Sequence, residues 1–145
     1  MKISTKARYG VRTLIDVALH QGERPVPLKD IAGRQQITLP YLEQIVPSMV
    51  KAGFLRSIRG PSGGVRLAKS SENIRISEVI EAMDGSMAPV DCVDDPEICE
   101  RSDQCVTCDV WTKIKEAVDG VLESVTLRSL VEQQRDKLRE KKDAR

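Results

Sequence analysis

Apolar residues recur at helical spacing in three segments of the first 53 residues. The residues that carry this pattern are Ala7, Val11, Leu14, Ile15 and Ala18, then Leu28, Ile31 and Ala32, then Leu42, Ile45, Val46, Met49 and Val50. Ser4 or Thr5 can cap the first predicted helix. Thr38 can cap the third, where Pro40 lies in the first turn and its missing N–H costs nothing. The last two helices are joined by the short turn QQI. Pro47 should kink the third helix behind its N-terminal half.

A hairpin is predicted directly after the third helix, in the segment GFLRSIRGPSGGVRLAK. Phe54, Leu55 and Ile58 indicate one strand, and Val65 and Leu67 indicate the other, around a tip rich in Gly and Pro. Two helices, a short turn and a hairpin form the pattern of a winged helix-turn-helix. A tip of this composition is usually only a turn. Because arginines flank it, we interpret it as a wing that contacts DNA.

The second half of the chain predicts a short helix and then a longer one. Ile76, Val79 and Ile80 share a face of the short helix, and the longer helix begins at residue 109. Apolar residues in the longer helix step by 3, 4, 3 and 4, the spacing of a coiled-coil seam, at Trp111, Ile114, Val118, Val121 and Val125. Such a helix could pack on its own domain. We favour pairing with a second copy, because helix-turn-helix proteins usually bind two half-sites as symmetric dimers. The charged tail RDKLREKKDAR should be frayed.

The expected fold is therefore mainly α-helical with a small β-hairpin wing. We divide it into a winged helix-turn-helix domain at 1–84, a cysteine loop at 85–108, and a dimerisation helix with a C-terminal tail at 109–145. Aromatic residues make up only 3% of the chain and hydrophobic residues 40%, so the core must be aliphatic. No apolar run is long enough to span a membrane, and the N-terminus does not resemble a secretion signal. We expect a cytoplasmic protein without a membrane partner, in a compartment where stable disulfides are uncommon.

The net charge of +1 hides a strong partition along the chain. Residues 1–75 carry thirteen Lys and Arg against five acids, whereas residues 76–109 carry ten acids against Arg101 alone. A basic first half is expected of a surface that binds nucleic-acid phosphates. A solvated surface without a partner would have the same charge, so charge does not decide between them.

All four cysteines lie within seventeen residues, at the spacing C-x6-C-x5-C-x2-C of CVDDPEICERSDQCVTC. Four thiolates in one short loop suit a zinc site or an iron–sulfur cluster, and the spacing alone does not choose between these. The acidic residues of the loop should raise the thiol pKa values, which disfavours free reactive thiols. No catalytic Ser/His/Asp set or phosphate-binding loop is present, and we do not expect an enzyme.

Four segments resemble the Rrf2 family of winged-helix regulators, of the IscR, NsrR and CymR types. These segments are KISTKARYG, LPYLEQIV, SIRGPSGG and CVTCDVW, and the resemblance runs in the same order from Met1 to about Val131. It implies a homodimeric bacterial transcription regulator, with the helices of 109–125 crossing at the dimer interface. The DNA-binding candidates for a double-stranded operator are Lys6, Leu39, Tyr41, Glu43, Gln44, Arg59, Gly60 and Ser62. Tyr41 could instead pack against the first helix.

The resemblance also implies an iron–sulfur cluster. The cluster ligands of the family map onto Cys92, Cys99 and Cys105, and Cys108 stands where IscR-type proteins have a histidine. Arg8 stands where NsrR-type proteins have an acidic ligand, and it cannot take that role. Four cysteines would hold either a [2Fe–2S] or a [4Fe–4S] cluster, unless Cys108 is a bystander. CymR-like members lack these cysteines and are a poor guide here.

The expected function is a dimeric DNA-binding regulator, a repressor, that senses iron–sulfur, redox or nitrosative status. The alternatives are a winged-helix regulator with a structural zinc or a free-thiol switch, and a small thiol or electron-transfer protein.

Overall fold

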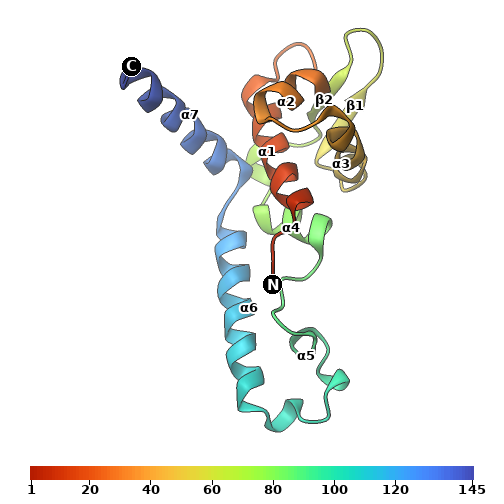
Figure 1. Cartoon of the computed structure of the whole chain (residues 1–145), viewed down its shortest axis with the longest axis vertical. Coiled ribbons are helices and arrows are strands. Elements are labelled where there is room, and N and C mark those ends of the chain that lie inside the picture. The colour runs from red at the N-terminus through yellow and green to blue at the C-terminus, as the bar shows by residue number, and fades with distance from the viewer.

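Helix α1 lies at the centre of the core of the computed structural model, which describes residues 1–145 (Figure 1). The elements are α1 (Thr5–His20), α2 (Leu28–Gln35), α3 (Leu39–Lys51), β1 (Leu55–Ile58), β2 (Gly64–Leu67), α4 (Ile76–Asp84), α5 (Asp91–Asp94), α6 (Val106–Ser124) and α7 (Leu127–Asp143), with 3₁₀ turns at Ser71–Asn73, Pro96–Ile98 and Ser102–Gln104. The Ser4 hydroxyl caps α1 by accepting from the Ala7 N–H at 3.0 Å. The Ser4 N–H also donates to the Asp84 carboxylate at 2.9 Å, which fastens the start of α1 to the end of α4.

The core contains 22 buried apolar side chains, and these come from α1 to α4, the hairpin, α7 and the loops between them. Leu14 and Val17 of α1 are completely buried, and so is Leu127 at the start of α7. Helix α6 adds no residue to this core and packs against it only through half-buried Val118 and Leu122. The predicted aliphatic core is confirmed for the first half of the chain, and its extension to α7 was not predicted.

A buried carboxylate fixes the angle between α1 and α2. Asp16 is completely buried. Arg34 donates two hydrogen bonds to its carboxylate, from Nη2 to Oδ1 at 2.7 Å and from Nε to Oδ2 at 3.0 Å. The Gln35 amide donates to Oδ2 at 2.9 Å. The pKa of Arg34 is raised, first by its hydrogen bond to Asp16. Charge-assisted bidentate bonds of this kind have a specific geometry, and here they hold α2 against α1.

The predicted helix-turn-helix and wing are confirmed. Gln36 takes a left-handed conformation (φ 55°) in the turn between α2 and α3, and α3 continues through Pro47. Strands β1 and β2 pair antiparallel. Val65 also bridges to Val26, so the wing is bonded to the segment before α2. A Cβ added to Gly64 would lie only 2.2 Å from the Val26 carbonyl oxygen, so this close approach requires glycine.

The long helix predicted from residue 109 is broken. Helix α6 ends at Ser124, and Val125 and Thr126 form a short extended joint before α7. The Ile76 N–H donates to the Val125 carbonyl at 2.9 Å, and the Leu127 N–H donates to the Ile74 carbonyl at 2.8 Å. These bonds to the segment before α4 satisfy the backbone where the helix stops. The placement of Val125 in a helical seam is therefore wrong.

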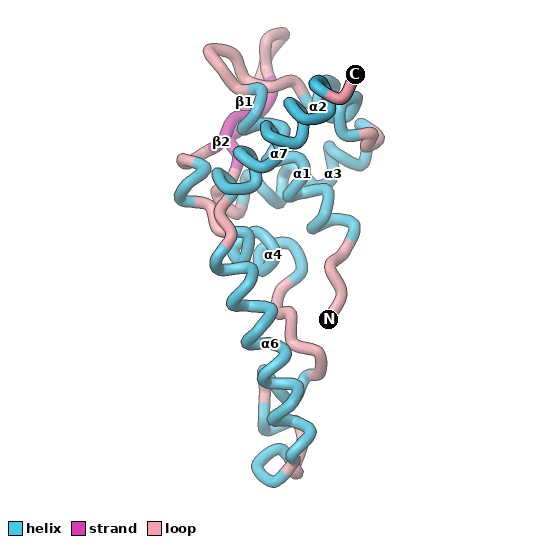
Figure 2. The backbone as a smooth tube through the Cα atoms, turned by 90° about the vertical axis from the view of Figure 1, so that its left-hand side faces the viewer, coloured by secondary structure: helices cyan, strands magenta, loops and turns pink.

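The charged tail is helical and not frayed, because α7 runs to Asp143 and is anchored by buried Leu127 and Val131. Figure 2 shows α7 crossing near α1 and α2, while α6 runs away from the winged helix toward the cysteine loop. None of the helices is both long and apolar enough to cross a membrane.

Candidate nucleic-acid interface and cysteine cluster

The N-terminal half of α3 presents two free polar side chains. Glu43 and Gln44 are exposed, whereas Leu39 and Tyr41 are half-buried and pack against the core. The ring of Tyr41 meets Tyr9 of α1 edge to face, with 5.7 Å between ring centroids. Packing against the first helix is thus the observed environment of Tyr41. Carboxylate and amide groups can read base edges in the major groove, and only Glu43 and Gln44 are fully available for this in α3.

The wing carries unpaired positive charge beside this helix. Arg59, Gly60 and Ser62 lie exposed at its tip, and Lys6 is half-buried at the start of α1. The strand register places Arg56 directly opposite Arg66. Arg66 donates to the Glu23 carbonyl, which leaves Arg56 facing a like charge.

Like charges directly across a strand pair repel each other, and a bound polyanion relieves that repulsion. Arg56 was missed in the sequence because its importance depends on the strand register. In Figure 1 the wing and α3 lie at one end of the molecule, and the cysteine loop lies at the other.

The structure brings together two of the four cysteines. Cys92 lies on α5 and Cys108 in the first turn of α6, with their sulfur atoms 3.9 Å apart. All four cysteines are free. Nowhere do three or more His, Cys, Asp or Glu side chains gather closely enough to hold a metal ion. The complete four-thiolate site is therefore not assembled.

The donor pair nevertheless fits thiolate coordination. Two thiolates at about 2.3 Å from one tetrahedral metal ion lie about 3.8 Å from each other. The separation of 3.9 Å between the sulfur atoms of Cys92 and Cys108 matches this value. Cys99 and Cys105 lie on the connecting segment between α5 and α6, beside short 3₁₀ turns.

The electrostatic setting differs between the thiols. Burial raises the pKa of Cys92, with further contributions from Cys108 and Cys99. Cys105 is the N-cap residue of α6, and its pKa is lowered, first by a hydrogen bond from the Thr107 hydroxyl and then by the Cys108 N–H. The expectation that acidic neighbours raise every thiol pKa is wrong for Cys105. Its thiolate is stabilised by local donors at a helix N-terminus.

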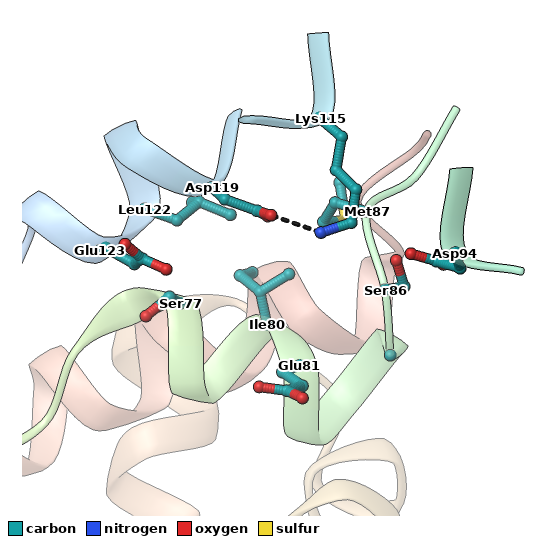
Figure 3. Close-up of a pocket in the computed structure, with 11 residues that line it drawn as sticks. Ser77, Ile80, Glu81, Ser86, Met87, Asp94, Lys115, Asp119, Leu122 and Glu123 are labelled. Atoms are coloured by element: carbon teal, nitrogen blue, oxygen red, sulfur yellow. Dashed lines mark hydrogen bonds and ion pairs between the residues drawn. The ribbon is translucent and has the colours of Figure 1, made fainter. Parts of the chain in front are cut away.

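A polar cleft connects the cysteine loop to the winged helix. It has a volume of about 350 Å³ and is lined by residues of α4, α5, α6 and the 85–87 turn. Figure 3 shows Lys115 paired with Asp119, one turn further along α6, with 2.5 Å between Nζ and Oδ2. The pKa of Lys115 is raised, first by Asp119 and more weakly by Asp94 and Glu123. Asp94 belongs to α5 and lines the same cleft as Lys115.

Helix α6 exposes an apolar stripe that differs from the predicted seam. Val106 and Val121 are 76% and 63% exposed, and Val110 is exposed too. Together with Ala117 they fall within about 60° of arc at 100° per residue. Of the predicted seam, Trp111 is exposed, Ile114 is half-buried, and Val118 packs with Val125 against the core of its own chain. We define Val106, Val110, Ala117 and Val121 as the α6 stripe. Its spacing of 4, 7 and 4 is visible in the sequence and differs from the 3, 4, 3 and 4 of the predicted seam.

Comparisons with known proteins agree on one family. Residues 3–133 match Rrf2, described as "Iron-dependent Transcriptional regulator". The chain is 42% identical over 134 residues to the HTH-type transcriptional regulator IscR of Serratia proteamaculans, covering 92% of this chain and 81% of that protein. It is 39% identical over 131 residues to Protein rrf2 of Nitratidesulfovibrio vulgaris, covering 90% and 87%.

Solved structures give the same result. CymR, the global cysteine regulator of B. subtilis, superposes with a TM-score of 0.76 at 36% identity, covering 92% of this chain and 98% of that one. T. potens IscR superposes with a TM-score of 0.74 at 38% identity, covering 92% and 88%. The fold thus does not separate IscR from CymR, although the sequence had suggested CymR as a poor guide. With a winged helix, a basic wing and relatives that are named regulators, the chain belongs to the Rrf2 family of transcription regulators and is not an enzyme.

Proposed function

We propose that this Rrf2-family regulator binds operator DNA as a homodimer, acts as a repressor, and responds to an iron–sulfur cluster held by its cysteine loop. The exposed N-terminal half of α3 beside an arginine-bearing wing is the observation that carries the DNA-binding part. Gln44 and Glu43 would read base edges, and Arg56 and Arg59 would neutralise phosphates. The α6 stripe would pack against its copy in a second chain.

Gln44→Ala should weaken binding to the operator by about 1–3 kcal/mol, which is roughly a 5- to 150-fold loss of affinity. The reason is that the exposed Gln44 amide has no partner within the chain and is free to bond a base edge. Fluorescence anisotropy with labelled DNA from the protein's own promoter measures this change. Affinity of the native protein should also fall linearly on a logarithmic scale as salt is added.

Gln133→Ala is the matched control, because Gln133 is equally exposed but lies on α7, away from α3. It should leave the affinity unchanged. Equal losses for both variants, or binding that is insensitive to salt, would contradict the proposed interface.

The cysteine loop would hold the cluster through Cys92, Cys99, Cys105 and Cys108. The Cys92 and Cys108 sulfur atoms, at a spacing suited to one metal ion, are the observation that supports this set. When bound, the cluster would supply an oxidisable iron centre whose presence or charge sets the conformation of residues 92–108. The chain would transmit that conformation through the cleft between α5 and α6, which Asp94 and Lys115 line, and through the joint at Val125.

Protein purified without oxygen should contain iron and acid-labile sulfide, and Cys108→Ser should retain less of both, because half of the placed thiol pair is gone. Elemental analysis with an absorbance spectrum measures both quantities. Thr107→Ser is the control, since it keeps the hydroxyl beside Cys105. A colourless native protein with one zinc per chain would replace the sensor by a structural zinc site. Full iron retention in the variant would make Cys108 a bystander.

A further inference from the structure

Cys92 and Cys108 are placed for a reaction with each other as well as for a shared metal. Their sulfur atoms are 3.9 Å apart, and they are the only two cysteines whose sulfur atoms contact one another. The two cysteines are sixteen residues apart in the chain. Cys92 lies on α5 and Cys108 in the first turn of α6. A disulfide needs its sulfur atoms about 2.05 Å apart, so the pair must close by about 1.9 Å.

The segment that carries Cys92 is free to make this movement. Helix α5 has only four residues, and neither it nor the following 3₁₀ turn contains a buried side chain. Cys108 lies instead in a helix of 19 residues and is 8% exposed. Closure would therefore move α5 toward α6, with α6 as the fixed partner.

Exposure also orders the two thiols in a reaction. Cys92 is half-buried and within reach of a small solute, whereas Cys108 is buried. Of these two thiols, Cys92 is therefore the one that a hydroperoxide can reach, and Cys108 is the one that can then attack the oxidised Cys92 sulfur.

We propose that, in the metal-free chain, hydroperoxides convert Cys92 and Cys108 into an intrachain disulfide. The Cys92 sulfur attacks one peroxide oxygen, an S–O bond forms, the O–O bond breaks, and water leaves. The Cys108 sulfur then attacks the Cys92 sulfur, the S–S bond forms, and the S–O bond breaks. The hydroxide that is released takes the Cys108 proton. Two thiols are oxidised, one hydrogen peroxide is reduced, and two waters are formed.

The disulfide would prevent the cysteine loop from binding metal. Both sulfur atoms of the pair are consumed, so neither can ligate metal until a dithiol reduces the bond. This consequence rests on the proposed cluster function, whereas the disulfide itself does not. Under oxidising conditions the chain would therefore remain in a disulfide form that cannot bind the iron–sulfur cluster.

The test uses metal-free protein, prepared with a chelator and freed of reductant without oxygen, and one equivalent of hydrogen peroxide. The thiol count in denaturant should fall from four to two per chain. The double variant Cys99→Ser/Cys105→Ser should fall from two to zero, and peptide mass spectrometry should find the 92–108 link within one chain. The matched variant Cys92→Ser/Cys108→Ser should keep its two thiols over the same time. Circular dichroism confirms that each variant is folded.

A link between any other two cysteines, links mainly between chains, or two thiols remaining in Cys99→Ser/Cys105→Ser would each overturn the inference. Uptake of iron and sulfide by the reduced protein tests the cluster proposal separately from the disulfide. If the link forms but the reduced protein takes up no iron and sulfide, the cluster proposal fails while the disulfide stands. If the reduced protein takes up iron and sulfide but peroxide forms no link, the disulfide proposal fails and the cluster proposal stands.

Discussion

Val121→Glu should convert the proposed dimer to a monomer and lower operator affinity by at least about 100-fold. Val121 is 63% exposed in the α6 stripe, and pairing would bury it against its copy. A carboxylate there would lose its hydration in the interface, and the stripe contains no cation to neutralise it. Two linked DNA-binding modules gain about 10²–10⁴ in avidity over one, and the monomer forfeits that gain. Sedimentation equilibrium gives the mass, and anisotropy gives the affinity.

Glu116→Lys is the control for a charge change on the same helix. Glu116 is exposed and points about 110° away from the middle of the α6 stripe, at 100° per residue. This variant should remain a dimer with native affinity. A dimeric Val121→Glu protein would place the interface on another surface and remove the role assigned to the stripe.

Asp16→Ala should lower the free energy of unfolding by about 2–3 kcal/mol, because it removes the buried acceptor of the charge-assisted hydrogen bonds from Arg34 and of the bond from Gln35. Asp16 accepts from both residues of α2 and is completely buried. The loss is a large part of the 5–15 kcal/mol that typically separates folded from unfolded states. Urea unfolding followed by circular dichroism measures it.

Glu132→Ala is the control for this variant, because it removes an ion pair that is exposed to solvent. Glu132 pairs with Arg128 on the surface of α7, where both side chains are more than half exposed. Solvent screens such a pair, and its loss should not change the unfolding midpoint measurably. Similar midpoints for the two variants would mean that the Asp16 network does not stabilise the fold.

The winged helix could be predicted because its signals are local. The apolar spacing around Leu42 and Ile45 placed α3, and the Gly- and Pro-rich tip placed the hairpin, with no need for distant contacts. Of the two predicted caps, Ser4 and Thr5, it is Ser4 that caps α1. These elements were confirmed because propensity, periodicity and turn chemistry agree along each of them.

The break at Val125 could not be predicted, because its cause lies fifty residues away. Val125 continues the apolar spacing there, and the helix ends where its backbone bonds to Ile74, Arg75 and Ile76. The bonds from Arg34 to buried Asp16 could not be predicted for the same reason, because the two residues are distant in the sequence. For the cysteines, spacing within the sequence suggested one site of four, whereas the geometry brings together Cys92 and Cys108.

The joint after α6 gives the molecule the mechanics of a lever. Arg75 donates to the Glu123 carbonyl at 2.8 Å and pins the end of α6 beside the winged helix. The 19 residues of α6 make an arm about 28 Å long, so a tilt of about 5° at the joint moves its far end by about 2.5 Å. A displacement of this size at the cysteine end would therefore correspond to a rotation of about 5° at the joint. In a two-fold symmetric dimer the angle between the two winged helices would change by twice that rotation, about 10°. In the proposed dimer, the length of α6 would convert a displacement of a few ångströms at the cysteine loop into a change in the angle between the two wings on DNA.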